Sequence, residues 1–153
     1  MNAVPPPQRP AHDEISAMVF QVAERLRHCF NAAASRLDLP PAQAQALATN
    51  RFPAPMRRLA EVLACDASNI TGIVDGLERR GLVHREPDPG DRRVKLVVLT
   101  EEGERRRQAL LSHVSEASAQ VFTLPETDQR ALRDLLARVV EARPEGGRPG
   151  CAL

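Results

Sequence analysis

The sequence predicts a mainly helical domain of the α+β class, with helices on both sides of a single β-hairpin. Two observations support this. Apolar residues recur every three or four positions over most of the 153 residues, which is the period of amphipathic helices. Two short apolar runs, 82–86 and 94–99, flank a turn rich in Asp, Pro and Gly. Hydrophobic residues make up 42% of the chain, which is enough to build a core.

The predicted domain starts after residues 1–12, which contain four prolines and no apolar run. We expect this segment to be disordered, and its composition does not fit a signal peptide. From about 13 to 38, an apolar stripe that begins at Ile15 and ends at Leu37 predicts one long helix. Such a helix is longer than the mean of roughly 11–12 residues, so it needs a partner surface for its apolar side.

Two shorter helices are predicted next, over about 41–49 and 56–64, with a turn at 50–55 between them. Pro41 suits the first turn of the first of these helices. The second helix directs its apolar side chains inward, at Leu59, Ala60 and Leu63.

A fourth helix is predicted over 66–80, and its two faces differ in chemistry. Asp66 or Ser68 can cap its start, and Gly81 ends it. Its inward positions follow the i, i+3, i+4, i+7 pattern and are Ile70, Ile73, Val74 and Leu77. Its outward positions are small and polar, namely Ser68, Asn69, Thr71, Gly72, Asp75 and Arg79. Such a face suits the major groove, where Asn pairs with adenine and Arg with guanine or phosphate, although an ordinary surface helix has the same pattern.

Two longer helices are predicted after the hairpin. Thr100 can cap the first, with Glu101 and Glu102 in the turn where the helix dipole favours anions. Pro125 opens the second, and residues 143–153 form a flexible tail. The outer helices carry apolar stripes too long for the small centre to cover. A two-fold partner would bury them, and the alternative is an intramolecular bundle.

The composition excludes several function classes. The net charge is only +1, so basic character has to be local, and Lys95 is the only lysine. Aromatic residues make up 3%, which argues against stacking of single-stranded bases. The three cysteines do not form a disulfide pattern, and the scattered histidines give no metal motif. No apolar run is long enough to span a membrane, and no catalytic motif is present. We therefore expect a cytoplasmic protein that is not an enzyme and has no cofactor.

The hairpin turn is the most specific feature. It carries Asp91, Arg92 and Arg93, and Lys95 follows. A thin hairpin tip with paired arginines fits the minor groove, whose negative potential attracts Arg. Asp91 could fix the Arg93 guanidinium by a charge-assisted hydrogen bond. Taken alone, the turn also fits a solvated loop with local charge neutralisation. Further candidates for phosphate contacts are Arg57, Arg79, Arg80 and Arg85.

The run LERRGLVHREPDPGDRRVKLVVLTEEG, 77–103, resembles the MarR family of bacterial transcription regulators. It contains the helix end with Gly81, the hairpin with an Asp-x-Arg pair, and then Leu-Thr and a glycine. The resemblance implies a MarR-like domain over 13–142. In it, a winged helix-turn-helix with a two-stranded wing, about 41–100, lies between dimerisation helices, about 13–38 and 101–142. It also implies that the helix from Ala67 reads the major groove, and that Arg93, oriented by Asp91, enters the minor groove.

We therefore predict a homodimeric repressor that binds double-stranded DNA at a pseudo-palindromic, inverted-repeat operator. The resemblance further implies release by a small phenolic or aromatic effector. Arg25 and His28 could anchor a carboxylate, or they are ordinary surface charges. Two alternatives are a thiol-based redox sensor acting through Cys29 or Cys65, and a winged helix that binds protein. The family's peroxide sensors support a first-helix cysteine with tyrosines, which this chain lacks, and both cysteines also suit packing positions.

Overall fold

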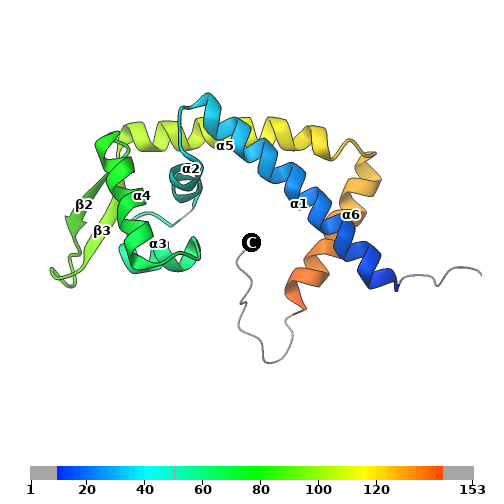
Figure 1. Cartoon of the computed structure of the whole chain (residues 1–153), viewed down its shortest axis with the longest axis horizontal. Helices are drawn as coiled ribbons and strands as arrows, with labels where there is room; N and C mark the ends of the chain where they lie inside the picture. The colour runs from blue at the N-terminus through cyan, green and yellow to red at the C-terminus, as the bar shows by residue number, and fades with distance from the viewer. Residues whose placement is uncertain (1–9, 50, 143–153) are drawn as a thin grey trace, which may run out of the picture.

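The computed structural model describes residues 10–49 and 51–142 (Figure 1). The predictions of a disordered start and a flexible tail fall mostly on 1–9 and 143–153, outside the described residues. The predicted helices and the hairpin are all present, with ends shifted by at most two residues. In chain order the elements are α1 (Ala11–Arg36), α2 (Pro41–Ala48), β1 (Ala54–Pro55), α3 (Met56–Val62), α4 (Ala67–Arg79), β2 (Val83–Pro87), β3 (Lys95–Leu99), α5 (Glu101–Val121) and α6 (Glu126–Glu141).

The first helix begins earlier than predicted. α1 starts at Ala11, so Ala11 and His12 are helical and do not belong to the predicted disordered segment. Pro10 immediately precedes the helix with φ −54°, and Asp13 and Glu14 occupy the first turn. Carboxylates in a first turn interact favourably with the positive end of the helix dipole, which explains the early start.

The sheet has three strands, in the order β1-β3-β2, and the prediction of a two-stranded wing missed the first. Ala54 pairs with Val97 and Pro55 with Leu96, both antiparallel. A two-residue strand that contains a proline has no alternating pattern, so no sequence period reveals it. β2 pairs with β3 from Val83 opposite Leu99 to Pro87 opposite Lys95, which forms the predicted hairpin.

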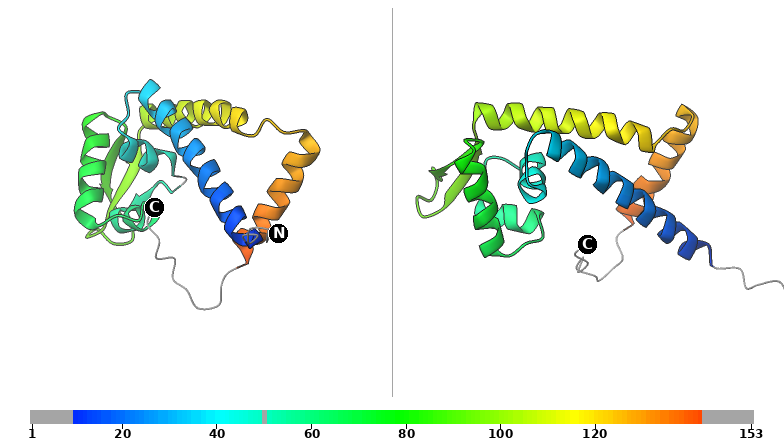
Figure 2. Two further views of the ribbon diagram at one scale, coloured as in Figure 1. Left: turned by 45° about the vertical axis from the view of Figure 1, so that its right-hand side comes forward. Right: turned by 45° about the horizontal axis from the view of Figure 1, so that its top comes forward.

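The elements form a compact head joined to an arm of long helices (Figures 1 and 2). α2, α3, α4 and the sheet make up the head, and α5 leaves it as a continuous rod with α1 packed alongside. Fully buried side chains form the core of the head, and one of them comes from α5. They are Leu47, Leu59, Ile70, Leu77, Val97 and, on α5, Leu110. α6 turns away at the end of α5 opposite the sheet, and none of its residues is buried.

Candidate nucleic-acid interface

One carboxylate, that of Asp66, caps the start of α4. Asp66 accepts a hydrogen bond from the Asn69 backbone N–H at 2.8 Å and another from the Ser68 hydroxyl at 2.7 Å. These bonds, the one from Asn69 first, hold the pKa of the Asp66 carboxyl below its ordinary value because they stabilise the charged form. Of the two predicted caps, Asp66 is the one that is used.

The end of α4 also follows the prediction. Gly81 has φ +70°, a conformation that favours glycine. Its N–H donates to the Glu78 carbonyl at 2.9 Å, and the Leu82 N–H donates to the Leu77 carbonyl at 3.0 Å. These bonds satisfy the last carbonyls of the helix and direct the chain into β2.

The outward face of α4 is open to solvent. Its apolar side, Ile70, Val74 and Leu77, is buried in the head, which turns the small polar residues outward. A Cβ placed on Gly72 would meet nothing within 4 Å, so the space beside the helix is open at this point. The exposed residues of the predicted reading face are Ser68, Asn69, Thr71, Gly72 and Arg79.

Asp75 is placed differently from the rest of the predicted face. It is half-buried, and its Oδ1 lies 2.5 Å from Nη2 of Arg85 on β2. Nη1 of the same guanidinium contacts the carboxylate of Glu78. The sequence predicted Asp75 as a DNA contact and Arg85 as a phosphate contact, but in the folded chain they are bonded to each other. The two residues are ten positions apart and lie on different elements, so their spacing in the sequence does not reveal this pairing.

The hairpin tip is ordered by its aspartates. Asp88 accepts from the Gly90 N–H at 2.7 Å, and Asp91 accepts from the Arg93 backbone N–H at 3.0 Å. We predicted a bond from the Arg93 guanidinium to Asp91, but Asp91 instead binds the Arg93 main chain. In this short turn the backbone N–H groups need acceptors, and the aspartate side chains supply them. Asp91 orients the backbone of Arg93, and the side chain projects freely.

Three cations surround this tip. Arg92, Arg93 and Lys95 are exposed, and the side chains of these three residues have no hydrogen bond or ion pair with any residue that the structure describes. Elsewhere on the head, Arg80 pairs with Asp38 at 3.6 Å, and Arg57 lies 3.8 Å from Glu61 with its side chain 91% exposed. The wing tip thus gathers three cationic side chains that have no ion pair with the described residues.

Of the three predicted sensor residues on α1, only Cys29 lines a cavity. Arg25 and His28 are exposed, and Nε2 of His28 lies 3.2 Å from Glu24. Cys29 is half-buried, and its thiol lies 3.7 Å from the Ala117 carbonyl. A cavity of about 200 Å³ beside Cys29, between α1 and α5, is lined instead by Arg36, His113, Glu116 and Gln120. Sequence reasoning missed Arg36 and His113, because their proximity depends on how the two helices cross.

Cys65 is half-buried and lines a hollow of about 520 Å³ between α3 and α4. In the described part of the chain, no three His, Cys, Asp or Glu side chains gather as metal ligands would. No helix among residues 10–49 and 51–142 is long and apolar enough to cross a bilayer.

Comparison with known proteins identifies the family. The sequence profile of the MarR family matches residues 46–95, from α2 to the start of β3. The structure of CouR from Rhodococcus jostii, solved with p-coumaroyl-CoA, is 30% identical in sequence, with a TM-score of 0.71 over 90% of this chain and 99% of CouR. The chain belongs to the MarR family. MarR of E. coli has the same fold, with a TM-score of 0.74 at 26% identity over 91% of this chain and 99% of that one.

Curated relatives match a shorter stretch. The transcriptional repressor NicR of Pseudomonas putida is 34% identical over 98 residues, which cover 62% of this chain and 61% of NicR. The regulator MhqR of Bacillus subtilis is 28% identical over 86 residues, 56% of this chain and 59% of MhqR. The matches thus span about three fifths of these relatives. Both are regulators of transcription and not enzymes, in agreement with the sequence-based prediction.

Proposed function

We propose that this MarR-family chain binds double-stranded DNA as a homodimer and represses transcription from an inverted-repeat operator. One observation carries the proposal. The exposed polar face of α4 and the unneutralised cations of the wing tip, Arg92, Arg93 and Lys95, belong to the same compact head. A helix with small polar side chains suits the major groove, and a thin arginine-bearing hairpin suits the minor groove beside it.

The two contact regions have different tasks. Asn69 and Arg79 on α4 supply the side chains that discriminate bases, with Ser68 and Thr71 as weaker donors and Gly72 allowing close approach. Arg93 enters the minor groove, with Asp91 fixing its main chain. Arg92, Lys95 and Arg57 contact phosphates and set the register without reading sequence.

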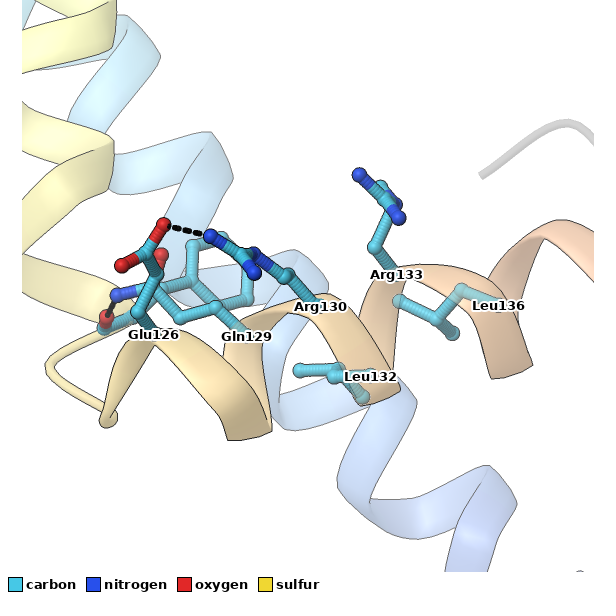
Figure 3. A pocket seen from close by; sticks show the side chains of 7 residues that line it. Glu126, Gln129, Arg130, Leu132, Arg133 and Leu136 are labelled. Atoms are coloured by element: carbon cyan, nitrogen blue, oxygen red, sulfur yellow. Dashed lines mark hydrogen bonds and ion pairs between the residues drawn. The ribbon is translucent and has the colours of Figure 1, made fainter.

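The homodimer is supported by apolar surface that one copy leaves open. Along the outer helices, α1 exposes Ile15, Met18, Val19 and Phe20, and α6 exposes Leu135, Leu136, Val139 and Val140. Figure 3 shows Leu132 and Leu136 on the open side of α6, in a groove of about 570 Å³ that Phe122 also lines. A second copy related by two-fold symmetry would cover these faces. It would also place two reading heads on two half-sites.

Two relatives support repression and release by an effector as part of this proposal. NicR is a repressor, and CouR was solved with an aromatic acyl thioester, p-coumaroyl-CoA. We expect an aromatic or phenolic acid to release this chain from DNA. The cavity beside Cys29 offers Arg36 and His113 as partners for a carboxylate.

Selection of bound sequences from random duplexes tests this function. The chain should enrich an inverted repeat with half-sites about one helical turn apart, and it should sediment as a dimer. Affinity should fall with salt, with log K declining by about 0.9 per phosphate contacted for each unit of log salt. Enrichment of no sequence, together with binding that does not respond to salt, would rule out the DNA-binding function.

A further inference from the structure

Arg85 joins the wing to the reading helix. It lies on β2, opposite Val97 of β3, and its guanidinium reaches back to α4. Nη2 is 2.5 Å from Asp75 Oδ1, and Nη1 contacts the Glu78 carboxylate. The Arg85 side chain is 25% exposed, which makes it the most protected member of this cluster, hereafter the Arg85 bridge.

The geometry of the bridge favours a mechanical role. A guanidinium is a flat, rigid fork, so two carboxylates bound to its two arms fix both its position and its orientation. Partial burial strengthens the bonds, since water competes less than at an exposed ion pair. The base of the wing is also joined to α4 through the turn at Gly81 and through the Thr100 bonds to Gly81 and Leu82, whereas the bridge lies farther along β2. A fork held in this way is suited to fix the angle at which the hairpin leaves the helix.

The charges argue against direct contact between the bridge and DNA. One guanidinium faces two carboxylates, Asp75 and Glu78, so the bridge carries a net charge of −1. A cluster with that charge gains nothing from a phosphate. The free cations lie farther out, at the hairpin tip and at Arg79 near the end of α4.

We propose, on the basis of the function proposed above, that Arg85 is a positioning residue for DNA recognition. It holds the wing at a fixed angle to α4, so that Arg93 reaches the minor groove while the polar face of α4 lies in the adjacent major groove. Asp75 and Glu78 are the anchors of Arg85 and not base contacts. Specificity at a half-site then depends on a residue that touches no DNA.

A distance measurement in the free protein tests the positioning role without DNA. Spin labels are attached at Ser68→Cys on α4 and Arg92→Cys on the wing, after Cys29, Cys65 and Cys151 are replaced by alanine. Arg85→Gln should broaden the distribution of label distances. Arg27→Gln, which removes an exposed arginine that pairs with Glu24 on α1, should leave it unchanged. An equally narrow distribution in Arg85→Gln would overturn the proposal.

Footprinting on the selected operator tests the consequence for recognition. Arg85→Gln should lose minor-groove protection at the wing and about tenfold in affinity, as expected when one of two groove contacts is no longer held in place, while major-groove protection by α4 persists. Arg85→Lys should recover part of the loss, because an ammonium cannot bind both carboxylates as a fork. A variant that is merely unstable would weaken both protections together, which would contradict the proposal.

Asp75→Asn separates anchoring from reading. It should weaken binding to all sequences alike and leave base preference unchanged. A changed preference at one base pair would make Asp75 a reader and overturn its assignment as an anchor. If the wild-type chain enriches no duplex, the DNA-binding function fails, while the label distances still decide whether Arg85 fixes the wing.

Discussion

Replacing Gly103 with alanine tests how tightly the reading head is joined to the arm. Gly103 lies in the first turn of α5, where its N–H donates to the Thr100 hydroxyl at 2.9 Å. The same hydroxyl donates to the Gly81 carbonyl at 2.7 Å, and the Thr100 N–H donates to the Leu82 carbonyl at 3.1 Å. The end of α4, the start of β2 and the start of α5 therefore meet at one joint.

The cost of a methyl group at this joint can be worked out from the structure. A Cβ on Gly103 would lie 1.9 Å from the Leu82 carbonyl oxygen and 2.9 Å from its carbon. The first distance is about 1.5 Å shorter than an ordinary contact, and the obstacle is backbone that cannot rotate away. Overpacking of this kind costs about 1–3 kcal/mol, whereas removing a glycine from a helix gains only about 0.5–1 kcal/mol. Because a 1.9 Å approach to backbone lies at the severe end of that range, we expect a net loss of about 2 kcal/mol.

Denaturant and thermal unfolding at one fixed protein concentration measure this loss. For a chain of this size, Tm should fall by roughly 4–8 °C. Gly72→Ala is the matched control, because a Cβ there meets nothing within 4 Å and should stabilise the helix by about 0.5–1 kcal/mol. If Gly103→Ala is as stable as the wild type, or if both variants shift in the same direction, the joint is not the tight contact described above.

Three further predictions concern the reading head. Arg93→Ala should weaken binding to the selected operator by about 1–3 kcal/mol, and unchanged affinity in titrations would remove Arg93 from the minor groove. Asn69→Ala should change base preference in repeated selection, whereas Arg57→Ala should weaken all sequences alike, and a uniform loss in both would make α4 a positioning helix. The pKa of Asp66 is lowered in the folded chain, so its contribution to stability is present above its unfolded pKa of roughly 3.9 and is lost as the pH falls through the lower folded value. The stability difference between wild type and Asp66→Asn should therefore change in acid and stay constant near neutrality, and a constant difference at all pH values would contradict the cap.

The sequence predicted those parts of the fold that depend on local signals. The helices, the Asp66 and Thr100 caps and the Gly81 stop follow from apolar periods and from hydrogen-bonding needs that neighbouring residues satisfy. β1 was missed, because Ala54–Pro55 is a strand only through its pairing with β3. The spacing of apolar residues does not reveal a strand that exists only because it pairs with another strand.

The candidate site was predicted less completely, for a related reason. Local chemistry pointed to the polar face of α4 and to the wing cations, and the structure exposes both. Spacing in the sequence does not give distances between elements or within a tight turn. It therefore could not predict which groups bind Asp75, Arg85 and Asp91. The same limit applied to Arg36 and His113 beside Cys29.

The absence of any buried residue in α6 has a consequence for the amount of protein that a cell needs. A helix of 16 residues without tertiary support is only marginally stable in water. In the proposed homodimer, formation of α6 and association of the two copies would be largely one event, so stability would rise with concentration by mass action. Dilute chains would then lack both the second head and an ordered α6. A repressor built this way occupies its operator only above a threshold of its own abundance, so the level of its synthesis acts as an input alongside any effector.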